Sequence, residues 1–192
     1  MPDSRVIAGD EFYTVILNCL TGERGVHAET AVAAAGRMAG TFLLRSFRLP
    51  IDDFPPGQSV YFEAVNDNGR RLIGLLGGTL QQLNVSVSVD PGQALALKDA
   101  FPPQLTILET QALLDQPLVV VAAKHGLAQE EAAEACTMTA ARIIQACSSA
   151  LDPNAAFGIA VYGIVEGSKT VPFRSEGDAE VPKPIQASGR EA

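Results

Sequence analysis

The stretch from Gly22 to Phe47, GERGVHAETAVAAAGRMAGTFLLRSF, constrains the fold more than any other part of the chain. At about 100° per residue, its apolar side chains cover most of the circumference of a helix, and only a narrow polar strip remains. A helix that is apolar on most sides is normally buried. We therefore expect residues 28–47 to form a central helix against which the other elements pack.

Small residues recur on this helix at a spacing of four, which indicates close neighbours. Gly36 and Gly40 each cost about 1 kcal/mol relative to Ala in a helix interior. We expect the close approach of another backbone to compensate for this cost. The same pattern is known from membrane helices, but the three arginines of the polar strip (Arg37, Arg45 and Arg48) argue against a membrane span.

Composition narrows the class of protein. The chain has 192 residues, of which 47% are hydrophobic and 19% charged, so it can bury a core of its own and falls outside the disordered class. Its net charge of −8 disfavours nucleic-acid binding. Three cysteines without paired spacing indicate a reducing compartment, and the start has no signal-peptide pattern. We expect a cytoplasmic protein that binds neither nucleic acid nor membrane.

Helical periodicity extends over much of the remaining chain. Residues 70–84 and 128–151 each carry an apolar face and a polar face. Three other segments (12–20, 118–123 and 157–165) fit a helix or a strand, and a helix is favoured for the first and the last. We predict a mostly α fold, a single-domain bundle of about five to seven helices with at most short strands. The domain covers residues 1–170, and a polar, disordered tail covers 171–192.

Capping residues predict where several helices begin. We expect residues 1–9 to form a loose arm and Asp10 to cap the first helix. Asp115 and Pro117 match the N-cap and first turn of a new helix, since Pro is favoured at that position. Asp152, followed directly by Pro, predicts another helix start in the same way.

Three glycines interrupt the polar face of the helix predicted over 70–84. Gly74, Gly77 and Gly78 stand where Ala or Lys would favour the helix more. Two explanations are open. Either another backbone or a ligand approaches this face, or the helix is broken near Gly77 and Gly78.

Motifs for catalysis or cofactor binding fail on inspection. Residues 163–170, GIVEGSKT, differ from a phosphate-binding loop by one residue, but no helix is predicted after Lys169 to bring N–H groups to a phosphate. The spacing within residues 122–132 is that of a helix-turn-helix, but its second helix opens with glutamates that repel DNA. Cysteines and histidines lack metal-ligand spacing. We expect no metal and no cofactor, and whether the protein is an enzyme is left open.

The lead-in to the central helix is the densest group of functional side chains. It contains Glu23, Arg24, His27 and Glu29, at a helix N-terminus where anions are favoured. His27 is the nearby group that titrates around neutral pH. A plain surface loop, with Arg24 paired to Glu23 or Glu29, explains the same residues without any ligand.

The arginine strip of the central helix is the second candidate site. Arg37 and Arg45 can pair within the molecule, for example with Asp52, Asp53 or the glutamates of residues 130–134. They can instead bind an acidic partner or a carboxylate ligand.

Two functions from different classes follow from these features. The first is self-association, as a homo-oligomer such as a dimer, or binding of a protein partner through the small-residue and apolar helices. The alternative is a small-molecule binding protein or enzyme for a carboxylate or phosphate, with its site near the start of the central helix. Its pocket would lie between that helix and the glycine face of residues 70–84, with His27, Glu29 and Arg37 as polar groups.

Overall fold

The computed structural model describes residues 3–51, 53–88 and 102–173, and within these ranges the chain forms six helices. They are α1 (Ser4–Leu20), α2 (Ala28–Ser46), α3 (Glu63–Gln82), α5 (Ile107–Lys124), α6 (Gln129–Cys147) and α7 (Pro153–Ser168). The prediction of a mostly α bundle of about five to seven helices is confirmed. No helix of the described ranges combines the length and apolarity needed to cross a bilayer.

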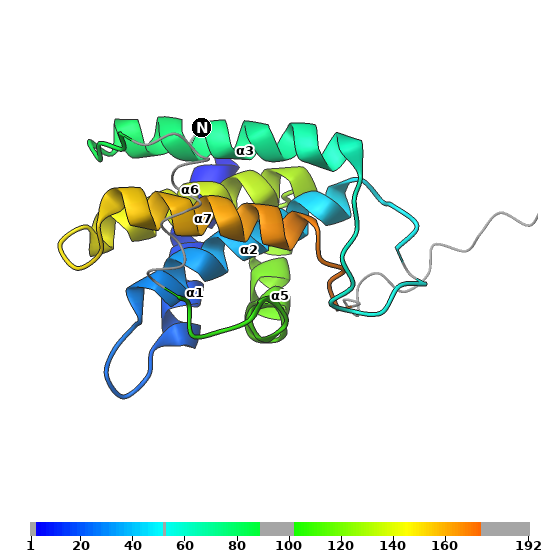
Figure 1. Cartoon of the computed structure of the whole chain (residues 1–192), viewed down its shortest axis with the longest axis horizontal. Coiled ribbons are helices and arrows are strands. Elements are labelled where there is room, and N and C mark those ends of the chain that lie inside the picture. The colour runs from blue at the N-terminus through cyan, green and yellow to red at the C-terminus, as the bar shows by residue number, and fades with distance from the viewer. Residues whose placement is uncertain (1–2, 52, 89–101, 174–192) are drawn as a thin grey trace, which may run out of the picture.

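Helix α2 is the centre of the bundle. Its residues from Thr30 to Leu44 are buried without a break, and it contacts each of the other helices named above. Figure 1 shows α7 crossing in front of α2, α3 along the edge of the bundle, and α5 seen almost end-on. Phe42 of α2 stacks on Phe12 of α1, with ring centroids 6.2 Å apart. The predicted role of this helix as the packing axis is confirmed.

The glycines of α2 permit a close crossing with α7. A Cβ atom on Gly36 would lie 2.6 Å from the carbonyl oxygen of Ala160, and one on Gly40 would overlap the backbone of Ile164. The fit is reciprocal, because a Cβ on Gly163 would lie 2.8 Å from the carbonyl oxygen of Ala33. Any side chain at these positions would push the two backbones apart. The predicted reason for the glycines of α2 is therefore confirmed.

Helix α3 lies on the outside of the bundle, where it packs on α6 and α7. Its buried face is formed by Leu72, Leu76 and Leu80. The glycines Gly74, Gly77 and Gly78 have no described atom within 4 Å of the position that a Cβ would occupy, and the helix runs unbroken past them to Gln82. The predicted break is wrong, and no other described backbone approaches this face.

The start of α1 differs from the prediction. Residues 12–20 are helical, but the helix begins at Ser4 and not after a loose arm that ends at residue 9. Asp3 is the N-cap and accepts a hydrogen bond from the backbone N–H of Arg5, while Arg5 also pairs with Glu134 of α6. The exposed side chains of Val6 and Ile7 hid this first turn, because they do not follow the apolar periodicity.

Helix α5 also differs, because it passes through Pro117 instead of starting there. Its N-cap is Thr106, whose hydroxyl accepts a hydrogen bond from the N–H of Glu109, while the Glu109 carboxylate accepts one from the N–H of Thr106. Asp115 is not a cap but the partner of Arg45. Residues 118–123 are helical, as one of the two alternatives predicted.

The end of the described chain follows the predictions more closely. Asp152 caps α7 with Pro153 at its first position, and residues 157–165 are helical. After α7 the chain turns back along residues 57–60: Val171 donates to the carbonyl of Gln58 (2.9 Å) and accepts from the N–H of Gly57 (2.8 Å). Most of the predicted tail, from residue 174 onward, lies outside the described residues.

Candidate functional site

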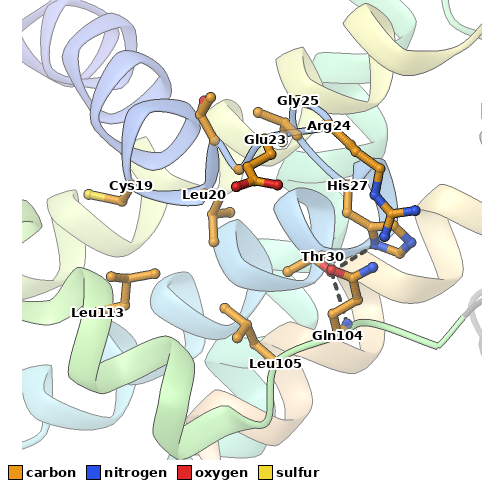
Figure 2. A pocket seen from close by; sticks show the side chains of 13 residues that line it. Cys19, Leu20, Glu23, Arg24, Gly25, His27, Thr30, Gln104, Leu105 and Leu113 are labelled. Carbon is orange, nitrogen blue, oxygen red and sulfur yellow. Dashed lines mark hydrogen bonds between the residues drawn. The ribbon is translucent and has the colours of Figure 1, made fainter.

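A cavity of about 720 Å³ opens at the N-terminal end of α2. Its walls are residues 19–27, which join α1 to α2, together with Thr30, residues 104–105 before α5, and Leu113 of α5 (Figure 2). These segments are far apart in sequence, and the packing of α1, α2 and α5 brings them together.

The loop between α1 and α2 is a tight turn. Gly22 and Gly25 exchange two backbone hydrogen bonds, of 3.1 and 3.0 Å. Gly25 has a φ of +87°, in a region that glycine adopts at little cost. Glu23 and Arg24 therefore stand at the tip of the turn, and both side chains are exposed at the cavity wall.

The first turn of α2 has no side-chain cap. His27 occupies the N-cap position, but its side chain does not bond the backbone of the turn. Its Nδ1 lies 2.8 Å from the hydroxyl of Thr30, which accepts a hydrogen bond from the N–H of Gln104. Its Nε2 lies 3.4 Å from the carboxylate of Glu29. The positive end of the α2 dipole therefore lies beside the cavity without a side-chain cap, and the carboxylate of Glu29 in the first turn offsets part of its charge.

The cavity is lined by both polar and apolar side chains. In Figure 2 Leu113 lies on the side opposite Arg24 and His27, and Leu105 lies close to Gln104 and Thr30. The side chain of Leu113 is large and apolar, yet it is 39% exposed. The lining therefore suits a ligand that carries both a charged group and an apolar body.

The two charged side chains at the turn are unpaired. Glu23 and Arg24 make no hydrogen bond or ion pair with any residue that the structure describes. The surface pair expected between Arg24 and Glu23 or Glu29 is not formed, and Glu29 faces His27 instead. Both charges are thus available to a ligand.

Arg37 lies outside the cavity wall but supports it. Its side chain is 6% exposed, and its Nε donates to Glu166 of α7 at 2.6 Å. Its Nη1 donates to the carbonyl oxygen of Leu105 (2.6 Å) and to the hydroxyl of Thr110 (3.2 Å). Because Leu105 is part of the wall, Arg37 fixes the position of that wall relative to α2.

Arg45 lies two turns farther along α2 and is remote from the cavity. It forms a two-pronged ion pair with Asp115 of α5 (2.5 and 2.7 Å) and donates to the carbonyl of Phe173. The internal pairing predicted for the strip is present, but its acids are Glu166 and Asp115. Neither Asp53 nor the acidic face of α6 takes part, and Asp52 lies outside the described residues.

The acidic face of α6 has basic partners of its own. Glu134 accepts from Arg5 of α1 and Arg71 of α3, both at 2.5 Å, and Glu130 accepts from Arg71. Burial raises the pKa of Glu134, but these hydrogen bonds outweigh burial and leave the pKa below its ordinary value. This network joins three helices and explains the glutamates without nucleic acid.

The pocket expected between the central helix and the glycine face of residues 70–84 is not where the cavity lies. Gly74 and Gly78 are exposed on α3, Gly77 borders a separate hollow beside Val85 and Phe157, and Arg37 points toward α5 and α7. Of the predicted site residues, Glu23, Arg24 and His27 line the cavity, Glu29 contacts His27, and Arg45 is elsewhere. Gln104 and Leu113 could not be predicted as wall residues, because only tertiary packing brings them to α2.

The other sequence candidates have structural roles. Burial raises the pKa of the Cys136 thiol well above its ordinary range and also raises that of Cys147, so both behave as small apolar groups. Among the described residues no group of His, Cys, Asp and Glu side chains is arranged to hold a metal ion. Residues 163–168 of GIVEGSKT are the end of α7, not the start of a helix. Comparison with family models, curated proteins and solved structures gives no match for this chain.

Proposed function

We propose that the protein binds a small molecule that places a carboxylate or phosphate group against the start of α2. The observation that supports this function is the cavity of about 720 Å³ in which Arg24 and His27 lie beside an uncapped helix N-terminus. Ligand pockets commonly enclose about 300–1,000 Å³, so this volume suits a small metabolite.

The attraction for an anion has two sources. The N-terminal end of α2 carries a partial positive charge of about half a unit, and its first N–H groups point along the helix axis out of the helix. Arg24 adds a guanidinium group, which can donate two parallel hydrogen bonds to one carboxylate or phosphate. Since Arg24 pairs with no residue that the structure describes, it can turn to a ligand without breaking any of the ion pairs described above.

A thermal-shift screen of small carboxylates and phosphates tests this function. A ligand that binds the folded state raises the melting temperature by an amount that grows with the ratio of its concentration to its Kd. We expect that shift to be smaller in Arg24→Gln and His27→Ala than in wild type. Arg70→Gln is the matched control, because Arg70 is an exposed arginine on α3 without an ion pair among the described residues. A shift of equal size in all these variants would contradict the proposed site.

Self-association is the second function that we propose, and a different observation favours it. Large apolar side chains are exposed on the adjacent helices α1 and α5, among them Val6 (51% exposed) and Val120 (56%). A second copy or a protein partner that covered them would remove apolar surface from water. Sedimentation at several concentrations should show a dimer that Val120→Asp dissociates. A strict monomer that captures no partner would rule this function out.

A further inference from the structure

We infer that the ligand of this cavity is a zwitterion with an aliphatic body, of the chemical class of the aliphatic amino acids. This inference rests on the proposed binding function and narrows it from any small anion to one kind of molecule. Three features of the cavity carry it: a carboxylate, a guanidinium group beside a helix N-terminus, and a wall of leucines.

The carboxylate of Glu23 is the feature that a simple anion does not explain. In Figure 2 it projects toward the middle of the cavity, which Arg24 and His27 also line. An anion bound near Arg24 would share the cavity with this negative charge, and like charges brought together are unfavourable. A ligand that also carries an ammonium group turns the repulsion into an attraction.

The arginines that hold the bundle together have carboxylate partners, whereas Glu23 and Arg24, like the exposed Glu63 and Arg70 of α3, have none among the described residues. The other described arginines of the bundle interior and of the α1–α3–α6 network, such as Arg37, Arg45 and Arg71, each have a carboxylate partner. Glu23 and Arg24 are neighbours of opposite charge that line one cavity, yet they pair neither with each other nor with another described residue. The Gly22–Gly25 turn holds them at its tip, so that a ligand can meet both.

The leucines indicate the body of the ligand. Leu20, Leu105 and Leu113 line the cavity and are each partly exposed. Leu105 is fixed in place because Arg37 donates to its carbonyl oxygen at 2.6 Å. An aliphatic group that covered these side chains would gain about fourfold in affinity for each buried methylene.

Three probes that share an isobutyl group separate the possible ligands. Leucine carries both charges, 4-methylpentanoate lacks the ammonium group, and 3-methylbutylamine lacks the carboxylate. We expect calorimetric titration of the full chain to show leucine binding at least tenfold more tightly than either analogue. Glu23→Gln should remove its advantage over 4-methylpentanoate, and Arg24→Gln should remove its advantage over the amine. Glu63→Gln, at an exposed and unpaired glutamate of α3, is the matched control and should change nothing.

The same titrations test the body of the ligand. Glycine has both charges and no side chain, so we expect it to bind at least tenfold more weakly than leucine. Leu113→Ser should weaken leucine binding several-fold and leave glycine binding unchanged. Far-ultraviolet circular dichroism checks that each variant, all of them at exposed positions, keeps its helices.

The failure of this inference differs from the failure of the proposed function. If 4-methylpentanoate bound as tightly as leucine, the zwitterion would be wrong, and if glycine did, the aliphatic body would be wrong. In either case the proposed function would stand if Arg24→Gln still weakened binding of the anion. If neither the four probes nor any anion of the thermal-shift screen bound to wild type, both would be wrong.

Discussion

Gly36 and Gly40 of α2 face the backbone of α7, whereas Gly74 and Gly78 of α3 face open space. Each glycine costs its helix about 1 kcal/mol relative to Ala. Between α2 and α7 the close packing of the two helices offsets this cost, because a Cβ there would overlap a neighbouring carbonyl. On α3 the described chain offers no such compensation. A glycine in a helix is therefore evidence of close packing only when its neighbour is known.

The arginines of the two regions also differ, in how far their side chains are buried. Arg37, between α2 and α7, is 6% exposed and meets Glu166 and two further acceptors. Arg71, which attaches α3 to α6, is 46% exposed, and one of its partners, Glu130, is 54% exposed. The arginine at the centre is thus buried, with its partner Glu166 21% exposed, whereas the arginine at the edge is half-exposed and only one of its partners, Glu134, is buried.

The largest effect should follow from Gly40→Ala. The new methyl group would overlap the backbone of Ile164, Gly167 and Ser168, which cannot move without separating α2 from α7. We expect a loss of about 3 kcal/mol or more in the free energy of unfolding, well above the gain of about 1 kcal/mol in helix propensity. Urea denaturation measures it. Unchanged or increased stability would show that the two helices are not as close as described.

Arg37→Met should rank second. The substitution leaves the carboxylate of Glu166 and the carbonyl of Leu105 without their donor in a largely buried place. We expect a loss of about 2–3 kcal/mol. Arg71→Met, the same change at the more exposed pair, should cost under about 1 kcal/mol. Equal losses in the two variants would contradict the contrast between centre and edge.

The sequence predicted the helical class and the centre of the bundle because both depend on local periodicity. The buried run of α2 and the purpose of Gly36 and Gly40 could be inferred from spacing and residue size alone. The outward glycines of α3 looked the same in sequence. The two sets of glycines differ in whether another helix packs against them, and sequence periodicity does not show this.

Pairing across the fold was also beyond the sequence. Arg37 and Arg45 clearly required acids, but Glu166 lies 129 positions from Arg37 and Asp115 lies 70 from Arg45. Asp115 looked like a helix cap because Pro117 follows it closely. The helix instead starts at Ile107 behind the Thr106–Glu109 capping box and continues through Pro117. For the site, the lead-in at residues 23–27 could be predicted, but its opposite wall could not.

Gly78→Ala, and separately Gly74→Ala, should stabilise the protein. Alanine restricts the unfolded chain and favours the helix, and a Cβ at either position meets no described atom within 4 Å. We expect a gain of about 0.5–1 kcal/mol for each, opposite in sign to Gly40→Ala. The measurement is urea denaturation at two protein concentrations. A loss of stability, greater at the higher concentration, would show that a second molecule packs against this face of α3.

The smallest effect concerns pH and the edge of the bundle. The pKa of Glu134 is lowered in the folded state by hydrogen bonds from Arg5 and Arg71, which outweigh the opposing effect of burial. A carboxyl group whose folded pKa lies below its unfolded pKa stabilises the fold above the unfolded value and loses that contribution as pH falls through the folded one. Wild type should therefore lose stability between about pH 5 and pH 3 more steeply than Glu134→Gln. In the control Glu63→Gln, whose glutamate has no ion pair among the described residues, stability should fall with pH as steeply as in wild type. If stability fell as steeply in Glu134→Gln too, this network would not hold α3 to the bundle.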